Sequence, residues 1–463
     1  MVSGGRLRSA FGSVWPLRHR DFALLWSSAL LSNVGNWMQT VAVGVLVTAR
    51  TGRAGWAGLV AAAGFLPLGL LSPVGGAISD RIDRRHWLIF TTVGEAAFAT
   101  VLALLAATGN ASPAAVTLTV FAGQCMAGLG LAAYMSMLPD LVEPDEVLSA
   151  ISLSSAQFNL GRVIGPVVAG VVIVSAGYTW AFAINAASFF AVVVALLLVR
   201  WRSGVNAEHE AGPMVRRLLS GWRVAISEPG CRAAIILISV VALLASPFIA
   251  LVPAVAIKLF HRGASGTSVL VAAQGLGAIV GVLALTPLSR RFGPRRLLVA
   301  DLFVLPAVLV GYGLAPTLQL AAVALFAVGL SYIWILSGLS TVAQMSAPAW
   351  ARGRVVGIYM MALGIGYPIG AVIQGGIADR AGLRPVVVGG AVILAALVFA
   401  FVLGRPKLAA GLDQARMGFA TSGGDDLRGE AGTSQTPPSG DAPAAGDAGV
   451  AGHRPTDSRS SRE

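Results

Sequence analysis

The sequence is poor in charged residues and in cysteine. Charged side chains make up 12% of its 463 residues, against about 25% in soluble domains, whereas hydrophobic residues make up 56%. This balance excludes an ordinary soluble protein and predicts a chain that crosses a membrane many times. The cysteines, Cys125 and Cys231, stand in or beside apolar runs. They are too few for a disulfide framework, and we expect neither a disulfide between them nor a metal site.

Motifs of the common enzyme and nucleotide-binding classes are also missing. The sequence has no Gly-x-x-x-x-Gly-Lys-Ser/Thr loop for phosphates. Its apolar runs contain no nucleophile with a base and no set of metal ligands. We therefore expect no enzyme and no cofactor. We also expect no removable signal peptide, because the first apolar run, 22–49, is longer than the roughly 7–15 apolar residues of such a peptide.

Apolar runs long enough to cross about 30 Å of hydrocarbon occur twelve times, which predicts an all-α membrane protein. An even number of spans places both termini on the same side of the membrane. The predicted spans are 22–49, 56–78, 87–107, 114–137, 150–175, 179–199, 233–257, 267–288, 297–315, 318–341, 354–377 and 385–404.

The basic residues are divided unevenly between the two sides of these spans, although the net charge is +12. Short Arg-rich loops stay in the cytoplasm, so we expect both termini to be cytoplasmic. Because topology explains the basic residues, we expect no nucleic-acid partner. The cytoplasmic side carries Arg6, Arg8, Arg18, Arg20, the cluster 81–85, the segment 200–232, Arg290, Arg291, Arg295, Arg296, Arg352, Arg354, Arg405 and Lys407. The opposite side carries Arg50, Arg53, Lys258, Arg262, Arg380 and Arg384.

The loop between spans two and three holds the most informative motif. It reads Gly76-Ala-Ile-Ser-Asp80-Arg81-Ile-Asp83-Arg84-Arg85. The pattern resembles the signature loop that follows the second helix in the major facilitator superfamily. It departs from the family at Asp83, where Gly is usual. The resemblance implies a role in gating, with the acidic residue pairing in one conformation only.

The two halves of the sequence show an internal repeat. Arg290-Arg-Phe-Gly-Pro-Arg-Arg296 follows span eight as the first cluster follows span two, and Gly165-Pro166 in span five is matched by Tyr367-Pro368 in span eleven. Such a repeat predicts two six-helix halves with a substrate site between them. The expected domains are a cytoplasmic N-terminus (1–21), an N-terminal half (22–199), a connector (200–232), a C-terminal half (233–404) and a disordered cytoplasmic tail (405–463).

Span five carries the spacing Gly161-x-x-x-Gly165-Pro166-x-x-x-Gly170. It resembles the antiporter signature in the fifth helix of drug-exporting major facilitators. The glycines also provide a flat face for a neighbouring helix, and Pro166 removes a backbone donor. A close-packing face and an antiporter function are compatible interpretations.

Arg162 lies near the middle of span five, where an ionised side chain is costly and by default functional. The alternative is a structural ion pair, for which Glu95 in span three is the acidic candidate of the same half. Glu95 is also our candidate for coupling to protons. Asp301 in span nine lies close to Arg296, and we expect a local pair there.

Polar and aromatic side chains within other spans are candidates for the lining of a central cavity. Asn33, Asn36 and Gln39 recur at helical spacing and share a face, which must meet protein or water rather than lipid. Interhelical hydrogen bonding is the alternative for each of them. The remaining candidates are Gln124, Asn159, Gln274, Phe248, Tyr332, Trp334 and Tyr359.

Residues from Arg18 to Trp26, Asn159 to Gly170 and Pro247-Phe248 resemble one branch of the superfamily, which holds the enterobactin exporter and macrolide-efflux proteins. The resemblance covers about residues 15–405. It implies proton-driven export of an amphipathic small molecule, such as a drug, antibiotic or siderophore, by a chain in the bacterial plasma membrane. Span four lacks the Arg of many drug:proton antiporters, and span one lacks a carboxylate.

Two other functions stay open at this point. The chain could import a small metabolite, although an uncharged span one argues against a charged nutrient. It could also be a membrane sensor or scaffold that transports nothing, against which the signature loop and Arg162 argue. We expect a monomer that handles a small-molecule substrate, and the sequence does not identify that substrate.

Overall fold

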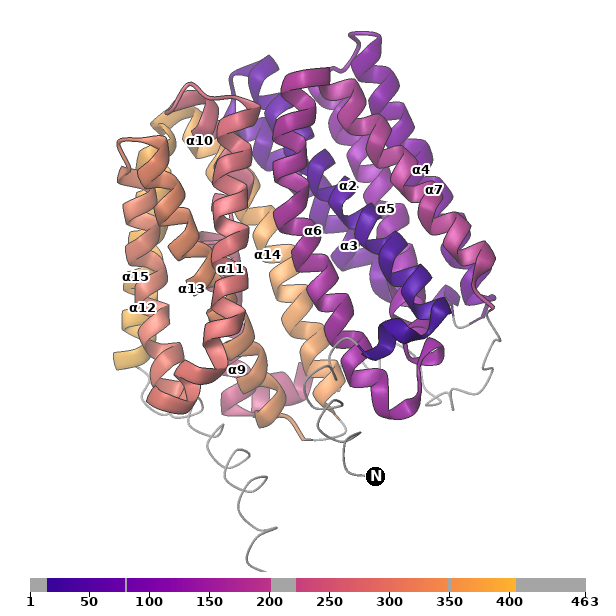
Figure 1. Ribbon diagram of the computed structural model, residues 1–463. Coiled ribbons are helices and arrows are strands. Elements are labelled where there is room, and N and C mark those ends of the chain that lie inside the picture. Colours follow the sequence, from indigo (N-terminus) through magenta and orange to yellow (C-terminus); the bar gives the residue numbers. More distant parts are fainter. Residues whose placement is uncertain (1–14, 80, 201–221, 349–350, 405–463) are drawn as a thin grey trace, which may run out of the picture. The chain divides into compact units, whose positions relative to one another are not determined.

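The twelve predicted spans are all helices in the computed structural model, which describes residues 15–79, 81–200, 222–348 and 351–404 (Figure 1). The described residues belong to one compact unit, Met1–Gly418. The observed helices begin and end within a few residues of the predicted spans, because long apolar runs flanked by polar loops determine them. The fold prediction is therefore confirmed.

The first six spans follow one another with short connections. Ser112 caps the fourth span by accepting a hydrogen bond from the backbone N–H of Ala115, at 3.2 Å, and Pro113 follows at its first position. Gly52, with φ +62°, ends the first span in the left-handed conformation that glycine adopts readily. The helices are α2 (Arg20–Thr51), α3 (Ala54–Ser79), α4 (Arg84–Ala107), α5 (Pro113–Met137), α6 (Val147–Ala176) and α7 (Tyr178–Leu198), with the 3₁₀ turns η1 (Trp15–Arg18), η2 (Pro139–Leu141) and η3 (Pro144–Glu146).

The second six spans contain one break. The seventh span is divided into two helices at residues 245–247, where the sequence prediction had one continuous run. Of the predicted connector, residues 222–227 are helical and 201–221 lie outside the described chain, as does the predicted tail 405–463. The helices are α9 (Pro229–Leu244), α10 (Phe248–Lys258), α11 (Ala264–Phe292), α12 (Pro294–Leu314), α13 (Leu318–Ser346), α14 (Arg352–Ala381) and α15 (Leu383–Gly404).

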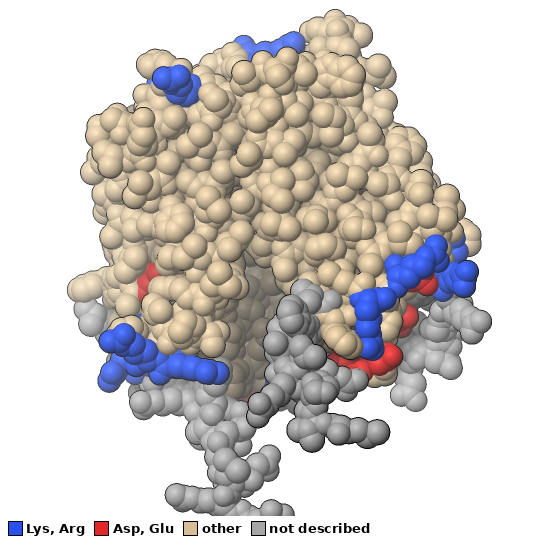
Figure 2. Space-filling view, in the orientation of Figure 1, with Lys and Arg blue, Asp and Glu red and all other residues tan. Residues whose placement is uncertain are grey.

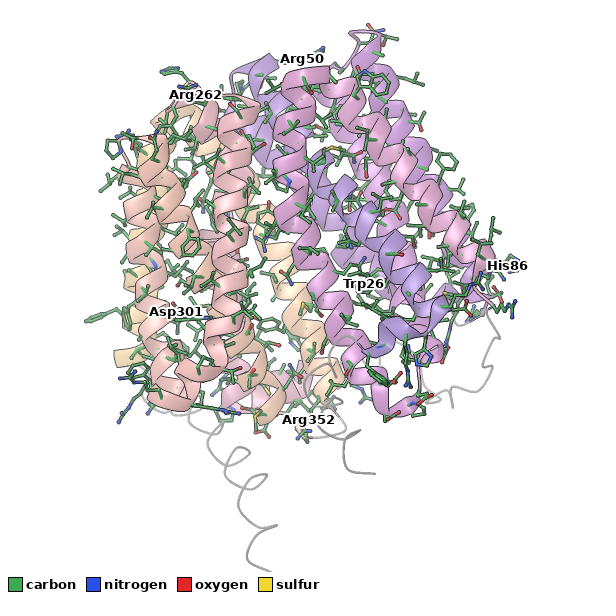
Figure 3. The ribbon with its side chains drawn as sticks, viewed as in Figure 1. Trp26, Arg50, His86, Arg262, Asp301 and Arg352 are labelled. Carbon is green, nitrogen blue, oxygen red and sulfur yellow. The ribbon has the colours of Figure 1, made fainter. Side chains whose placement is uncertain are left out.

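The two ends of the helix bundle differ in charge (Figure 2). We call the end that holds Arg18, Arg20, the cluster 81–85, the cluster 290–296 and Arg352 the basic end, and the end that holds Arg50, Arg53, Lys258, Arg262 and Arg380 the far end. Arg50 and Arg262 lie at one end of the bundle, opposite Arg352 and His86 (Figure 3). This distribution follows the loop asymmetry in the sequence.

The first six spans meet the last six mainly where α3 packs against α14 and α6 against α11, and α10 also contacts α2 and α3. Glycine allows the close approach. A Cβ on Gly58 would overlap the carbonyl oxygen of Ala371, and one on Gly375 would lie 2.9 Å from that of Ala54. These contacts join the halves at the far end. Figure 2 shows the surface hollowed between the halves at the basic end.

Candidate functional site

Arg162 is buried near the middle of α6, with 9% of its surface exposed. Its Nε is buried without a hydrogen-bond partner, and no described residue forms an ion pair with it. Its guanidinium carbon lies 5.5 Å from the ring centroid of Trp37 on α2, a cation–π contact. A charge at this depth without an anion is the most unusual electrostatic feature of the described chain.

Aromatic side chains from both halves surround this guanidinium. Phe158, one turn before Arg162, meets Trp37 edge-on with ring centroids 5.8 Å apart. From the other half, the hydroxyls of Tyr332 on α13 and Tyr367 on α14 lie within range of electrostatic interaction with Arg162. Arg162 and the two tyrosines therefore lie in the same region, at the junction of the halves, and make up the candidate site.

Each tyrosine is held in place by a second aromatic ring. Tyr332 packs edge-on against Phe248, with centroids 5.9 Å apart, and Tyr367 packs edge-on against Phe65 of α3, at 5.0 Å. Neither Tyr367 nor Phe65 was among the sequence candidates. Edge-to-face pairs orient rings firmly, so the site offers one cation within rigid aromatic walls.

The break in the seventh span belongs to the same site. The Oγ of Ser246, in the break, lies 2.8 Å from the Oη of Tyr332. Pro247 is the N-cap residue of α10, and Phe248 is the first residue of that helix. Discontinuous helices at mid-membrane are typical of transporter binding sites, because their unpaired backbone groups face a cavity rather than lipid.

The glycines of α6 explain how Arg162 comes so close to α2. A Cβ on Gly161 would lie 2.8 Å from the Cβ of Asn33, and one on Gly165 would lie 2.5 Å from that of Trp37. Gly170 faces the other half, where a Cβ would lie 2.8 Å from the Oγ of Ser268 on α11. These glycines serve close packing both within the first half and between the halves, while Pro166 is buried within the helix.

The polar face of α2 makes interhelical hydrogen bonds. Asn185 of α7, which is fully buried, donates its Nδ2 to Oε1 of Gln39 at 2.9 Å and to Oδ1 of Asn36 at 3.4 Å. Asn185 was missed in the sequence because a lone amide in an apolar span has no partner nearby in the chain. Asn36 and Gln39 thus tie α2 to α7.

Glu95 lies apart from Arg162. It lines a cavity of about 10 Å³ together with Asn36, Gln39 and Gln124, which is about the smallest cavity that can hold one water molecule. Within the described chain, Glu95 has no hydrogen-bond or ion-pair partner, and it forms no pair with Arg162. The structural ion pair considered from the sequence is therefore absent from this conformation.

The other candidates bond within their own helix or pack between helices. Asn159 donates to the carbonyl oxygen of Ser155 in its own helix, Trp334 donates to that of Gly281, and Tyr359 donates to that of Leu336. Gln274 is buried in α11, and its Nε2 has no partner among the described residues. The structure thus groups Tyr332 and Phe248 with Arg162 and places Trp334 and Tyr359 in packing positions.

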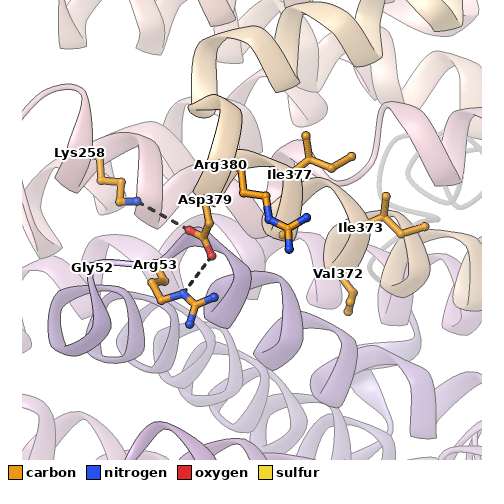
Figure 4. Close-up of a pocket in the computed structure, with 9 residues that line it drawn as sticks. Gly52, Arg53, Lys258, Val372, Ile373, Ile377, Asp379 and Arg380 are labelled. Atoms are coloured by element: carbon orange, nitrogen blue, oxygen red, sulfur yellow. Dashed lines mark hydrogen bonds and ion pairs between the residues drawn. The ribbon is translucent and has the colours of Figure 1, made fainter.

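At the far end, Asp379 of α14 joins the two halves (Figure 4). Its carboxylate accepts hydrogen bonds from the backbone N–H groups of Ala54, at 2.5 Å, and Gly55, at 3.0 Å, which begin α3. It also forms ion pairs with Arg53, at 3.4 Å, and Lys258, at 3.8 Å. A carboxylate at a helix N-terminus between two cations is a strong polar contact, and we call these five residues the far-end latch.

At the basic end, the signature loop is attached to the first half. Arg84 pairs with Asp140 at 3.6 Å, and Arg85 donates to the carbonyl oxygen of Leu197 at 2.8 Å. Asp83, where the family usually has Gly, caps α4 by accepting a hydrogen bond from the backbone N–H of His86. A Cβ on Gly76 would lie 3.4 Å from the Cβ of Ala132, so Gly76 packs against α5. Arg81 is exposed, and Asp80 lies outside the described residues.

The prediction that Asp301 forms a local ion pair with Arg296 is wrong. Asp301 is buried, with 3% exposed, and accepts a hydrogen bond from the Oγ of Ser331 on α13 at 2.6 Å. The side chain points into the bundle because the helix face of Asp301 packs against α13. No ion pair with Arg296 occurs in the part of the chain that the structure describes.

Known proteins resemble this chain over most of its length. The sequence model of the transmembrane secretion effector family matches residues 11–417. The multidrug efflux pump Tap of Mycolicibacterium fortuitum is 26% identical over 371 residues, which are 78% of this chain and 90% of that protein. The enterobactin exporter EntS of Citrobacter koseri is 28% identical over 307 residues, 66% of this chain and 72% of the exporter.

Solved structures show the same fold. The nucleoside transporter NupG matches with a TM-score of 0.63 at 14% identity, covering 82% of this chain and 98% of its own. A bacterial homologue of the human lysosomal transporter Spinster, inward-facing and unoccupied, matches with a TM-score of 0.65 at 15% identity, covering 87% and 98%. The predicted family is confirmed: the chain belongs to the transmembrane secretion effectors, an efflux-transporter family of the major facilitator superfamily.

Proposed function

We propose that this efflux transporter exports an amphipathic small molecule with an anionic group, by alternating access and in exchange for protons. The observation that carries the proposal is the unpaired Arg162 between aromatic walls of both halves. A buried cation gains most from an anion, and the aromatic rings suit an apolar body. The two relatives are named as exporters of small molecules, drugs for one and enterobactin for the other.

The basic end is proposed to face the cytoplasm, with both termini on that side of a bacterial plasma membrane. Short loops rich in Arg are retained there. The far end is held together by the far-end latch, while the hollow in Figure 2 opens at the basic end. A substrate would thus enter from the cytoplasm and leave once the latch opens. One chain supplies the whole site, so a monomer is the proposed transporting unit.

Glu95 is proposed to carry the coupling proton. It is a carboxyl without a partner in a cavity that it shares with Asn36, Gln39 and Gln124. Asn36 and Gln39 are bonded to Asn185, so protonation of Glu95 would act on the contact between α2 and α7. Because α2 also carries Trp37, which lies beside Arg162, a shift of α2 would also alter the substrate site.

The anion-binding role can be tested with probes of different charge. Anilinonaphthalene sulfonate, neutral Nile red or cationic ethidium would be added outside inside-out vesicles energised with a proton gradient, and uptake into the vesicles would report export. Arg162→Ala should reduce transport of the anionic probe by about 100-fold, on the order of 3 kcal/mol for a buried charge contact. Arg162→Lys should restore little, because Lys lacks the planar fork.

Arg291→Ala, which removes a cation from the basic end, is the matched control and should transport at the wild-type rate. If Arg162→Ala transported the anionic probe as fast as this control, the proposed site would be wrong. A wild-type preference for ethidium would also contradict an anionic substrate.

The proton role requires two carboxyl variants in the same assay. Glu95→Gln should remove the stimulation of transport by a pH gradient while leaving exchange of unlabelled for labelled substrate intact. Asp301→Asn changes another buried carboxyl within a span, nearer the basic end, and should keep the stimulation. If instead only Asp301→Asn abolished it, Asp301 rather than Glu95 would carry the proton.

A further inference from the structure

We propose that the far end has a binding site for an anionic phospholipid. The site is a cavity of about 490 Å³ between the start of α3, the end of α10 and one face of α14. Its lining combines cations with an apolar wall (Figure 4). The proposed occupant places its phosphate among the cations and an acyl chain along α14.

The charges of the cavity do not balance. Arg53, Lys258 and Arg380 line it together with one acid, Asp379. Asp379 pairs with Arg53 through Nε only and with Lys258 at 3.8 Å, and the Arg53 side chain is 67% exposed. Arg380 forms no hydrogen bond or ion pair with any residue that the structure describes. An anion is therefore the complementary ligand.

The apolar wall distinguishes a lipid from a free anion. Val372, Ile373 and Ile377 are 40%, 50% and 49% exposed and lie on one face of α14. Gly376, on the same face, has no atom within 4 Å of a would-be Cβ, so the surface is recessed there. An acyl chain fits such a stripe, whereas a small hydrophilic anion gains nothing from it.

The position of the site agrees with a lipid headgroup. α14 ends at Ala381, one residue beyond Arg380, so the cations stand at the end of a membrane span while the apolar wall lies one to two turns deeper. Phosphates of a bilayer lie at this level, and basic residues there attract anionic lipids. The alternative is that the cations meet any headgroup without preference.

The test is native mass spectrometry of the full chain in detergent, titrated with dioleoyl phosphatidylglycerol. Arg380→Gln removes the unpaired cation without touching the far-end latch. It should weaken binding of the first lipid by about five- to tenfold. Arg262→Gln removes a cation from the same end outside the cavity and should leave that affinity unchanged.

Two further comparisons, one with a variant of the apolar wall and one with a second lipid, identify the class of ligand. Ile373→Asn, which changes only the apolar wall, should also weaken phosphatidylglycerol binding, and dioleoyl phosphatidylcholine should bind less tightly than phosphatidylglycerol to the wild type. Equal affinity in wild type, Arg380→Gln and Arg262→Gln would overturn the proposal, as would equal affinity for the two lipids. Displacement of the lipid by millimolar glycerol phosphate would show a site for a free anion instead.

Discussion

Two segments of the chain share a pattern of paired glycines followed by Asp-Arg, and they end helices at opposite ends of the bundle. Gly75-Gly-Ala-Ile-Ser-Asp80-Arg81 ends α3 at the basic end, and Gly375-Gly-Ile-Ala-Asp379-Arg380 ends α14 at the far end. Asp379 bonds across to the other half. Arg84 and Arg85, which follow the first segment, bond within their own half, to Asp140 and to the carbonyl oxygen of Leu197.

The difference indicates how the transporter alternates. Polar contacts between halves must form at one end while they are broken at the other. In this structure the contact of a carboxylate with a helix N-terminus is made at the far end, by Asp379 with the start of α3. The glycine and Asp-Arg pattern that the two segments share predicts the converse contact in the opposite conformation, between Asp80 and the start of α14 near Arg352.

The largest effect is expected from a side chain that prevents far-end closure. A Cβ on Gly58 would overlap the backbone of Ala371 across the halves, so Gly58→Leu must separate α3 from α14. Export should fall by up to about 150-fold, since overpacking costs about 1–3 kcal/mol. Gly357→Leu, at a glycine with no atom within 4 Å of a would-be Cβ, is the control. Normal export by Gly58→Leu would show that the contact is not needed.

Removing the negative charge of Asp379 from the far-end latch should have the next largest effect. Asp379→Asn keeps the shape of the side chain but weakens charge-assisted hydrogen bonds that are worth about 1.5–3 kcal/mol each. The ratio of far-end-closed to far-end-open protein should fall about 10- to 100-fold, and export rates in vesicles should drop with it. Asp145→Asn, at an exposed acid of the basic end, should leave export unchanged; a shared loss would point to a general effect of charge.

Asp80→Asn tests the converse contact. We expect transport to fall several-fold, while equilibrium substrate binding stays within about threefold because the change affects gating rather than the substrate site. Equilibrium binding and transport would be measured on the same preparation. A large loss of binding without a loss of conformational exchange would assign Asp80 to recognition instead.

The smallest effect is expected where the basic end bonds within one half. Asp140 and Arg84 form a partly exposed pair at 3.6 Å, and such pairs contribute about 0–1 kcal/mol. Asp140→Asn should therefore change export and thermal stability only slightly. If Asp140→Asn lost as much export activity as Asp379→Asn, the proposed difference between the two ends would be contradicted.

Much of the fold could be predicted because its determinants are local. Apolar length determines the spans, and the count of Arg in loops separates the two ends. The break at 245–247 was not predicted, since Ser246-Pro247 stands in an otherwise unbroken apolar run. A kinked helix and a divided helix share that sequence pattern, and only packing decides between them.

The site was predicted in part, for the same reason. Arg162 stood out because the cost of a charge within a span depends on that span alone. Tyr367, Phe65 and Asn185 matter through partners in other helices, which no local pattern reveals. Asp379 was not among the sequence candidates, although the likeness of its segment to the Asp80 segment was a signal that could have identified it.

The most direct test of the account is the distance between the halves at the far end. Spin labels at Asn110→Cys and Pro316→Cys, exposed positions in loops of different halves, would be attached after Cys125 and Cys231 are changed to Ser. Double electron–electron resonance should give one main short distance in the wild type and in Asp140→Asn. Asp379→Asn should add a longer distance as a major population. Identical distance distributions in all three proteins would contradict the claim that Asp379 holds the far end closed.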